Sequence, residues 1–160
     1  MKSRATKSSL EILIVRASKD RVPRAFLERW VSTIVKSLLG EKLNAKARRQ
    51  LVSAEALTLV FVPASEMTRL NREFRGKNKV TDVLSFAPTE DGSLGELVFC
   101  LDVIERQARE HDLTKNQELG YMVLHGVLHL LGYDHETSKK DARAMFGVQD
   151  RVFDAVLSRW

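Results

Sequence analysis

Cysteine is nearly absent from this sequence, since Cys100 is the only one in 160 residues. A lone thiol excludes a disulfide bond within the chain, and such scarcity is typical of proteins from a reducing compartment. No apolar run approaches the roughly 20 residues that span a membrane, and residues 1–10 lack the apolar centre of a signal peptide. We therefore expect a cytoplasmic protein that makes no use of a membrane.

Internal repeats, low-complexity tracts and linker-like segments are also absent. A chain of this length buries about 70% of the surface that it exposes when unfolded, which is enough for one core. We therefore expect residues 1–160 to form a single domain, with the polar and basic residues 1–9 as a flexible arm.

Acidic residues are outnumbered, because 26 lysines and arginines face 21 aspartates and glutamates, for a formal net charge of +5. A basic balance suits a polyanionic partner, and nucleic acid is the most common one. An excess this small also serves solubility alone. Charge therefore admits a nucleic-acid partner without establishing one.

Hydrophobic periodicity and turn residues predict an α+β fold. Four segments are predicted as strands, the last two joined in a hairpin: residues 10–15, 56–62, 83–86 and 94–101. Five segments are predicted as helices: residues 23–40, 65–74, 102–111, the segment from 114 through His129, and 138–160. We expect a small mixed four-stranded sheet packed with about five helices, and a parallel, right-handed crossover between the first two strands.

Several helix ends carry capping signals. Ser65 is predicted as an N-cap, while Asp102 with Glu105 and Thr114 with Gln117 match the capping-box pattern. Residues 41–53 show no clear pattern and stay unassigned.

Histidine is scarce too, yet three of the four lie within the eleven residues from His125 to His135. His125 and His129 are four residues apart and project from one face of a helix. Gly132 can end that helix in the left-handed conformation, so that His135 turns back toward the pair. Three neutral imidazoles hold zinc with one coordination position open, as in catalytic sites. The spacing predicts a metal site on this helix and the turn after it.

Two other interpretations of these histidines remain. They could be packed in the core, but buried imidazoles without partners are costly. The spacing also matches metzincin peptidases, in which a glutamate after the first histidine is the general base. That position is Gly126 here, which disfavours a peptidase. Glu118 lies two turns earlier and is expected to complement the helix dipole.

The densest basic stretch before the histidines comprises Arg69, Arg72, Arg75, Lys77 and Lys79. Zinc can activate water and polarise a phosphoryl oxygen, and an arginine fork stabilises charge on a phosphate. Such a pairing suits phosphodiester cleavage. Taken alone, however, Arg75 is explained as well by its favourable position at the end of its own helix.

The segment from His125 to His135, HGVLHLLGYDH, resembles the signature of the YbeY family of metal-dependent endoribonucleases, which act in ribosomal RNA maturation. Upstream, LNREFRGK at residues 70–77, TDVLSF at 81–86 and GELV at 95–98 are similar to that family as well. These matches cover about residues 56–136 in the family's order. Two departures are Ala87, which precedes Pro88, and Glu96, where aspartate is common.

The resemblance implies that His125, His129 and His135 are the ligands of one zinc ion, with nickel or another divalent ion as an alternative. It implies that Arg75 is the functional arginine. The substrate would be single-stranded RNA near the 3′ end of small-subunit ribosomal RNA. The protein would also serve ribosome quality control, with the small ribosomal subunit as a partner.

Some questions stay open in the sequence. The nucleophile could be a water or the RNA 2′-hydroxyl. Asp82 and Asp134 could orient a ligand histidine or cap local backbone. Cys100 is expected in the core and His111 on the surface, but either could be a fourth ligand, which would make the ion structural. A ribosome-assembly factor with such an ion, and a metallopeptidase, remain alternatives to the nuclease.

Overall fold

The structure, a computed structural model, describes residues 10–160. The strands of the described residues are β1 (Glu11–Arg16), β2 (Ala56–Phe61), β3 (Val83–Phe86) and β4 (Ser93–Phe99). The helices of the described residues are α1 (Arg24–Leu39), α2 (Ala45–Ser53), α3 (Ala64–Arg75), α4 (Leu101–Glu110), α5 (Lys115–Leu130) and α6 (Lys139–Leu157). The predicted arm at residues 1–9 lies outside this range.

The four strands form one sheet in the order β1-β2-β4-β3. β1, β2 and β4 are parallel, whereas β3 runs antiparallel to β4 and forms the predicted hairpin with it. The α+β class, the mixed sheet and the parallel pairing of the first two strands are therefore confirmed.

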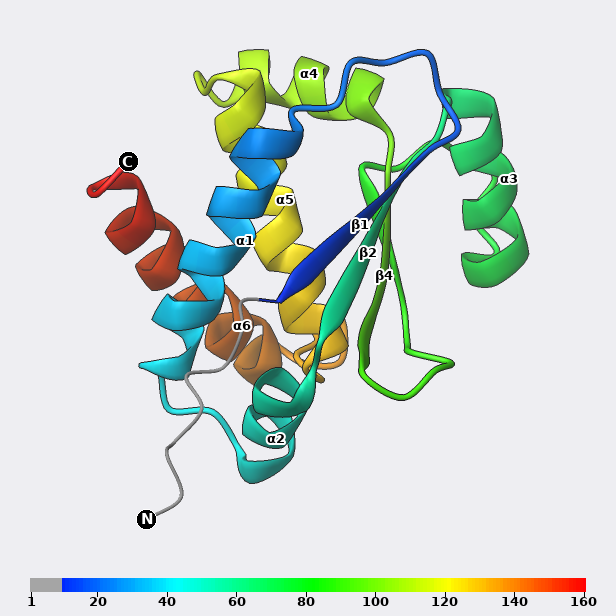
Figure 1. Cartoon of the computed structure of the whole chain (residues 1–160). Coiled ribbons are helices and arrows are strands. Elements are labelled where there is room, and N and C mark those ends of the chain that lie inside the picture. Colours follow the sequence, from blue (N-terminus) through cyan, green and yellow to red (C-terminus); the bar gives the residue numbers. More distant parts are fainter. Residues whose placement is uncertain (1–9) are drawn as a thin grey trace.

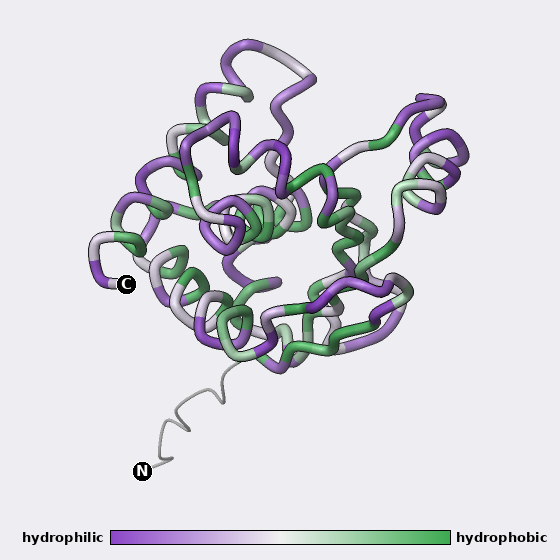
Figure 2. The backbone as a smooth tube through the Cα atoms, turned by 90° about the horizontal axis from the view of Figure 1, so that it is seen from above, coloured by the Kyte–Doolittle hydropathy of each residue, from purple (hydrophilic) through white to green (hydrophobic). Residues whose placement is uncertain are grey.

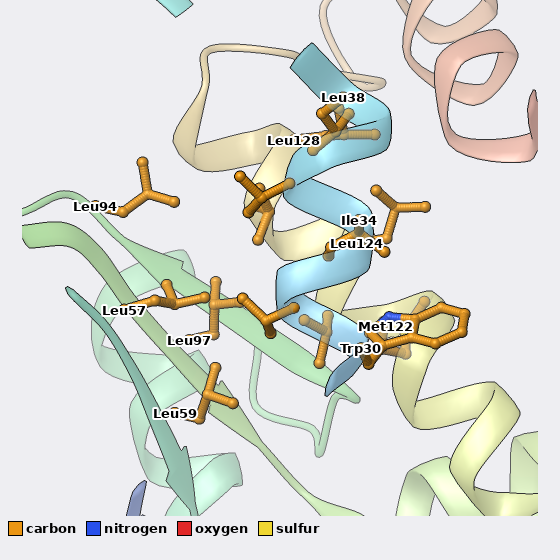
Figure 3. Close-up of a cluster of buried hydrophobic side chains, with 14 of the residues drawn as sticks. Trp30, Ile34, Leu38, Leu57, Leu59, Leu94, Leu97, Met122, Leu124 and Leu128 are labelled. Atoms are coloured by element: carbon orange, nitrogen blue, oxygen red, sulfur yellow. The ribbon is translucent and has the colours of Figure 1, made fainter. Parts of the chain in front are cut away.

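One face of the sheet packs against α1 and α5 (Figure 1). Strand β2 shows how the sequence selects this face, because Leu57, Leu59 and Phe61 alternate with less buried residues and are themselves fully buried. Figure 3 shows Leu57 and the β4 residue Leu97 directed at the helices. This layer places α5, the helix with two of the histidines, directly against the sheet.

Close contact between α1 and α5 fixes the position of α5. The Trp30 indole Nε1 donates a hydrogen bond to the carbonyl oxygen of Gly120 over 2.9 Å. A Cβ atom at Gly120 would lie 2.6 Å from the Trp30 ring, so only glycine allows this approach. The two helices are thereby held side by side.

Both ends of α5 follow the sequence prediction. Thr114 Oγ1 accepts from the Gln117 backbone N–H at 3.1 Å, and Gln117 Oε1 accepts from the Thr114 N–H at 3.0 Å. This is the predicted capping box. Beyond the helix, Gly132 has a φ of 96° in the left-handed region. The chain reverses there, which brings His135 back to His125 and His129.

The opposite face of the sheet is partly covered by α3, which stands apart from the other helices (Figure 1). Met67 of α3 packs with Leu84 and Val98 in a second, smaller hydrophobic cluster. Seen from above in Figure 2, α3 lies at the margin of the molecule and carries many hydrophilic residues. Among residues 10–160, no helix combines the length and the apolar character that a bilayer span requires.

The described residues contain six helices, where about five were predicted. The additional one is α2, which forms in the unassigned segment. Asn44 caps it by accepting from the Ala47 N–H at 2.8 Å. Only Ala47 and Leu51 of this helix are buried, so its apolar pattern is too short to stand out among charged residues.

Two capping predictions were wrong. Ser65 lies inside α3, because the helix begins just after Pro63, whose φ of −71° is already set by its ring. Helix α4 begins at Leu101, and Cys100 is its N-cap residue without a side-chain hydrogen bond. Asp102 therefore lies within the first turn rather than at a capping box, and β4 ends two residues earlier than predicted.

Candidate metal centre

Three histidines converge at the C-terminal end of α5. His125 and His129 lie on the helix, and His135 lies in the loop between α5 and α6. Each offers one ring nitrogen, and the three nitrogens lie within 4.8 Å of one another. The Nε2 atoms of His125 and His129 are 3.1 Å apart. The arrangement could hold one metal ion, as the spacing predicted.

A glutamine that the sequence analysis missed orients the first histidine. Gln149 of α6 is fully buried, and its Oε1 lies 3.0 Å from Nδ1 of His125. With Nδ1–H donating to this carbonyl oxygen, the lone pair of His125 is on Nε2, which faces His129. Such a partner on the other ring nitrogen is the usual companion of a histidine that binds a metal. Its sequence signal was slight: a polar residue between Met145 and Val152 on the apolar side of the last helix.

Burial keeps the helix histidines uncharged. Desolvation, together with the neighbouring imidazoles, lowers the pKa of His129 to about 4. Desolvation also lowers the pKa of His125, against the opposing effect of the Gln149 hydrogen bond. Neutral imidazoles are the form that binds a cation.

The residues present fit a divalent metal ion. The Nδ1 atom of His135 is buried and has no hydrogen-bond partner among the described residues. Buried polar nitrogens are rarely left without a partner. Three imidazoles with their nitrogens this close also form a donor set that zinc and other borderline divalent ions accept. The donor set suits a divalent cation without selecting one element.

Neither candidate for a fourth ligand joins the cluster. Within residues 10–160, the group that could hold a metal comprises only the three histidines. Cys100 is buried in the cluster beneath α3, as expected for a core residue. His111 is exposed on the surface, and its Nδ1 lies 3.0 Å from the carboxylate of Glu118. Glu118 is in the first turn of α5, as expected, but it is fully buried and contacts His111.

The hydrogen bonds of the two candidate orienting carboxylates go to groups other than the histidines. Asp82 accepts hydrogen bonds from the Val83 N–H at 2.7 Å and from Gln107 Nε2 at 3.2 Å. Asp134 accepts from the Glu136 N–H at 2.8 Å. Both line the same cleft as the histidines. Of the two roles left open for these aspartates, the structure shows the second, and the residue that contacts His125 Nδ1 is Gln149.

Gly126 occupies the position of the metzincin glutamate and faces the sheet. A Cβ atom there would lie 2.7 Å from Cδ2 of Leu97 on β4. The glycine therefore lets α5 pack closely on the strand. It supplies no general base to the histidines.

Arg75 lies at the other side of the histidine cleft, at the last position of α3. Gly76 follows with a φ of 67° and ends the helix in the left-handed conformation. One terminal nitrogen of Arg75 lies 2.8 and 2.9 Å from the two carboxylate oxygens of Glu136. Arg75 holds the pKa of Glu136 below its ordinary value. The structure thus brings the predicted arginine and the three histidines to one cleft.

The cleft has a volume of about 810 Å³. Two further cations line it, Lys77 and Lys79 in the loop after α3. Asn71 ties this loop to α3, because its Nδ2 donates to the Lys79 carbonyl oxygen at 2.8 Å. The site therefore combines three convergent ring nitrogens with a basic rim of Arg75, Lys77 and Lys79, although Asp82, Asp134 and Glu136 also line the cleft.

Comparisons with known proteins agree with this geometry. The family model described as "Endoribonuclease YbeY" matches residues 13–157. A protein of that name from Bdellovibrio bacteriovorus is 51% identical over 152 residues, which cover 94% of this chain and 97% of the relative. Another from Staphylococcus saprophyticus is 38% identical over 138 residues, covering 80% and 87%.

A solved structure shares the fold. The solution structure of TM1509 from Thermotoga maritima aligns with a TM-score of 0.60 and 30% sequence identity, covering 93% of this chain and 91% of that one. The family model spans nearly all of the described residues, including the three histidines and Arg75. This chain therefore belongs to the endoribonuclease YbeY family.

Proposed function

We propose that residues 1–160 act as one endoribonuclease domain that uses zinc and cuts single-stranded RNA. Its proposed task is the maturation of small-subunit ribosomal RNA near the 3′ end, together with ribosome quality control. This task places it in the cytoplasm and in contact with the small ribosomal subunit. The observation that carries the proposal is one cleft that holds three convergent histidines and Arg75 in a chain of this family.

The metal would be held by His125, His129 and His135. When bound, a divalent cation supplies a positive charge that polarises a phosphoryl oxygen and lowers the pKa of a water. Three neutral imidazoles are a frequent ligand set for catalytic zinc, and they also suit nickel. Gln149 would keep the His125 ring in the orientation that directs Nε2 to the cation.

Arg75 is proposed to bind the phosphate. Its guanidinium presents a planar set of donors that matches phosphate oxygens and stabilises the charge that builds on them. In the structure Glu136 occupies part of this donor set, so a phosphate would replace a carboxylate there. Lys77 and Lys79 on the same rim would attract the RNA backbone.

The alternatives predict different outcomes. An assembly factor with a structural ion calls for a fourth protein ligand, and within residues 10–160 the cluster has three. A metzincin-like peptidase calls for a general base at residue 126, where Gly126 packs on Leu97. The cleft and its basic rim therefore favour the nuclease.

The test uses purified protein, a fluorescently labelled single-stranded RNA and an unstructured peptide. We expect RNA cleavage that stops with a chelator and returns with zinc or nickel, whereas the peptide stays intact. His129→Ala should lose both the bound metal and the cleavage. His111→Ala is the matched control, because it removes a histidine outside the cleft and should retain both.

The products also identify the nucleophile. Attack by the 2′-hydroxyl leaves a 2′,3′-cyclic phosphate, whereas attack by water leaves a linear phosphate on one product. Cleavage that persists in His129→Ala would show a contaminating nuclease and contradict the assignment. Protein that binds RNA and unfolds on chelation, but never cleaves, would favour the assembly factor.

A further inference from the structure

One aromatic ring beside the cleft is unusually open to solvent. Phe74 precedes Arg75 at the end of α3, and 57% of its surface is exposed. It is the most exposed of the large hydrophobic residues in the described part of the chain. Its ring lines the cleft that contains the three histidines.

The ring is held in place rather than free. Phe86 of β3 contacts it with a centroid distance of 5.0 Å and an interplanar angle of 80°, which is an edge-to-face arrangement. Asn71, one turn earlier on α3, is almost fully buried and fixes the following loop through Lys79. An exposed aromatic surface is therefore presented from a rigid element.

The two sides of Phe74 differ in the charged residues that they offer. The cleft on one side is lined by three cations, Arg75, Lys77 and Lys79, and also by three carboxylates, Asp82, Asp134 and Glu136. On the other side lies a second groove of about 850 Å³, to which Phe74 and Phe86 also contribute. Its charged lining residues in the described structure are all acidic: Glu66, Glu90 and Glu96. Of the two sides, only the first offers cations to a polyanionic backbone, and the second offers carboxylates alone.

We propose that Phe74 is a stacking platform for one nucleobase of single-stranded RNA, the base adjacent to the phosphate bound by Arg75. The inference rests on the proposed nuclease function and extends it to a base-binding subsite. Consecutive residues of a helix diverge by about 100°, so Arg75 and Phe74 can engage the phosphate and the base of one nucleotide separately. Stacking is open to every base, since each has a flat aromatic face.

The subsite explains why the substrate would be single-stranded. A base within a duplex is paired and stacked on its neighbours, so its face is not available to Phe74. Single strands present unstacked bases to aromatic side chains. The acidic groove beyond the ring would then keep the RNA backbone on the side of the histidines.

The experiment is a double-mutant cycle between the protein and the RNA. A short single-stranded RNA with one mapped cleavage position is compared with versions that lack the base on either side of that position. In the wild type, loss of the stacked base should lower kcat/KM roughly tenfold, mainly through KM. Phe74→Ala should show the same loss on intact RNA and little further loss on the abasic RNA. Phe74→Trp keeps an aromatic ring and should retain the activity that Phe74→Ala loses.

Matched measurements separate stacking from folding. Metal content of Phe74→Ala should equal that of the wild type, and its unfolding temperature should fall only slightly, through the lost contact with Phe86. Leu13→Ala should leave RNA cleavage unchanged, because Leu13 is an exposed apolar residue outside the cleft. Equal abasic penalties in the wild type and Phe74→Ala would overturn the inference while the nuclease stands. Unchanged cleavage by Phe74→Ala would also overturn it and point to a protein interface. A wild type that neither binds nor cuts RNA would overturn both proposals.

Discussion

The histidines of the chain occupy two environments, and the pKa values of His125 and His129 shift in the opposite direction to that of His111. His125 and His129 are packed with His135, and desolvation lowers the pKa of both helix residues. His111 is exposed beside the buried carboxylate of Glu118, and this hydrogen-bonded partner raises its pKa. The first environment keeps imidazoles neutral for a cation, whereas the second favours a charged imidazole that serves as the cation itself.

The largest effect is expected at the hydrogen bond between Gln149 and the histidine cluster. Gln149→Leu removes the acceptor of His125 Nδ1–H and should lower metal affinity by about 10- to 100-fold, because the ring is no longer held in orientation. Chelator competition measures this affinity. Gln149→Glu keeps an acceptor and should retain most of it. Equal affinity in Gln149→Leu and the wild type would show that the cluster needs no support from α6.

Loss of the hydrogen bond between His111 and Glu118 should lower the stability of the fold and leave metal affinity unchanged. His111→Ala leaves the buried Glu118 carboxylate without its imidazole partner. We expect it to lower the free energy of unfolding by about 1 kcal/mol. The effect is small because His111 is exposed, and solvent weakens its interaction with Glu118. Urea unfolding measures this, and bound metal should not change. Asn116→Ala, an exposed neighbour on α5, is the control and should change neither quantity.

The pH dependence of stability should follow His111 in a defined direction. Its pKa in the folded protein is raised above the ordinary value of 6.5, so the folded state binds this proton more tightly than the unfolded state. The stabilisation is fully present below pH 6.5 and is lost as pH rises through the raised pKa. Chemical unfolding of wild type and His111→Gln across this range should differ most at the acidic end. A constant difference would contradict the assignment.

The smallest effect is expected at the cleft, where Glu136 offers a contrast to Glu118. Glu136 is half exposed and pairs with Arg75, a contact that water and salt weaken. Glu136→Gln should free the guanidinium and raise RNA affinity by less than about fivefold. Glu110→Gln removes the same charge outside the cleft. If both variants bind RNA equally well, RNA affinity depends on the net charge of the protein and not on the pairing of Glu136 with Arg75.

Much of the site could be predicted because its signals are local. His125 and His129 are one helical turn apart, and Gly132 marks the reversal that brings His135 to them. The capping box at Thr114 likewise needs only three residues of context. Gln149 lies 24 residues from its partner His125, so no short-range spacing indicates their contact.

Other features depended on tertiary context. The pairing of Glu118 with His111 arises because α4 and α5 pack together, and sequence reasoning gave each residue a separate role. Helix α2 was missed since only Ala47 and Leu51 of it reach the core. Ser65 has the chemistry of an N-cap, but the backbone had already turned helical after Pro63. Local sequence propensity does not predict a feature that depends on contacts with other parts of the chain.

The lack of a side chain at Gly126 also limits which new activities could be engineered into this site. A metzincin peptidase carries its general base at that position. Yet a glutamate introduced there would enter the interface between α5 and Leu97, where a Cβ atom already has no room. A protein engineer would first have to move or shorten the Leu97 side chain, whose methyl groups fill this space.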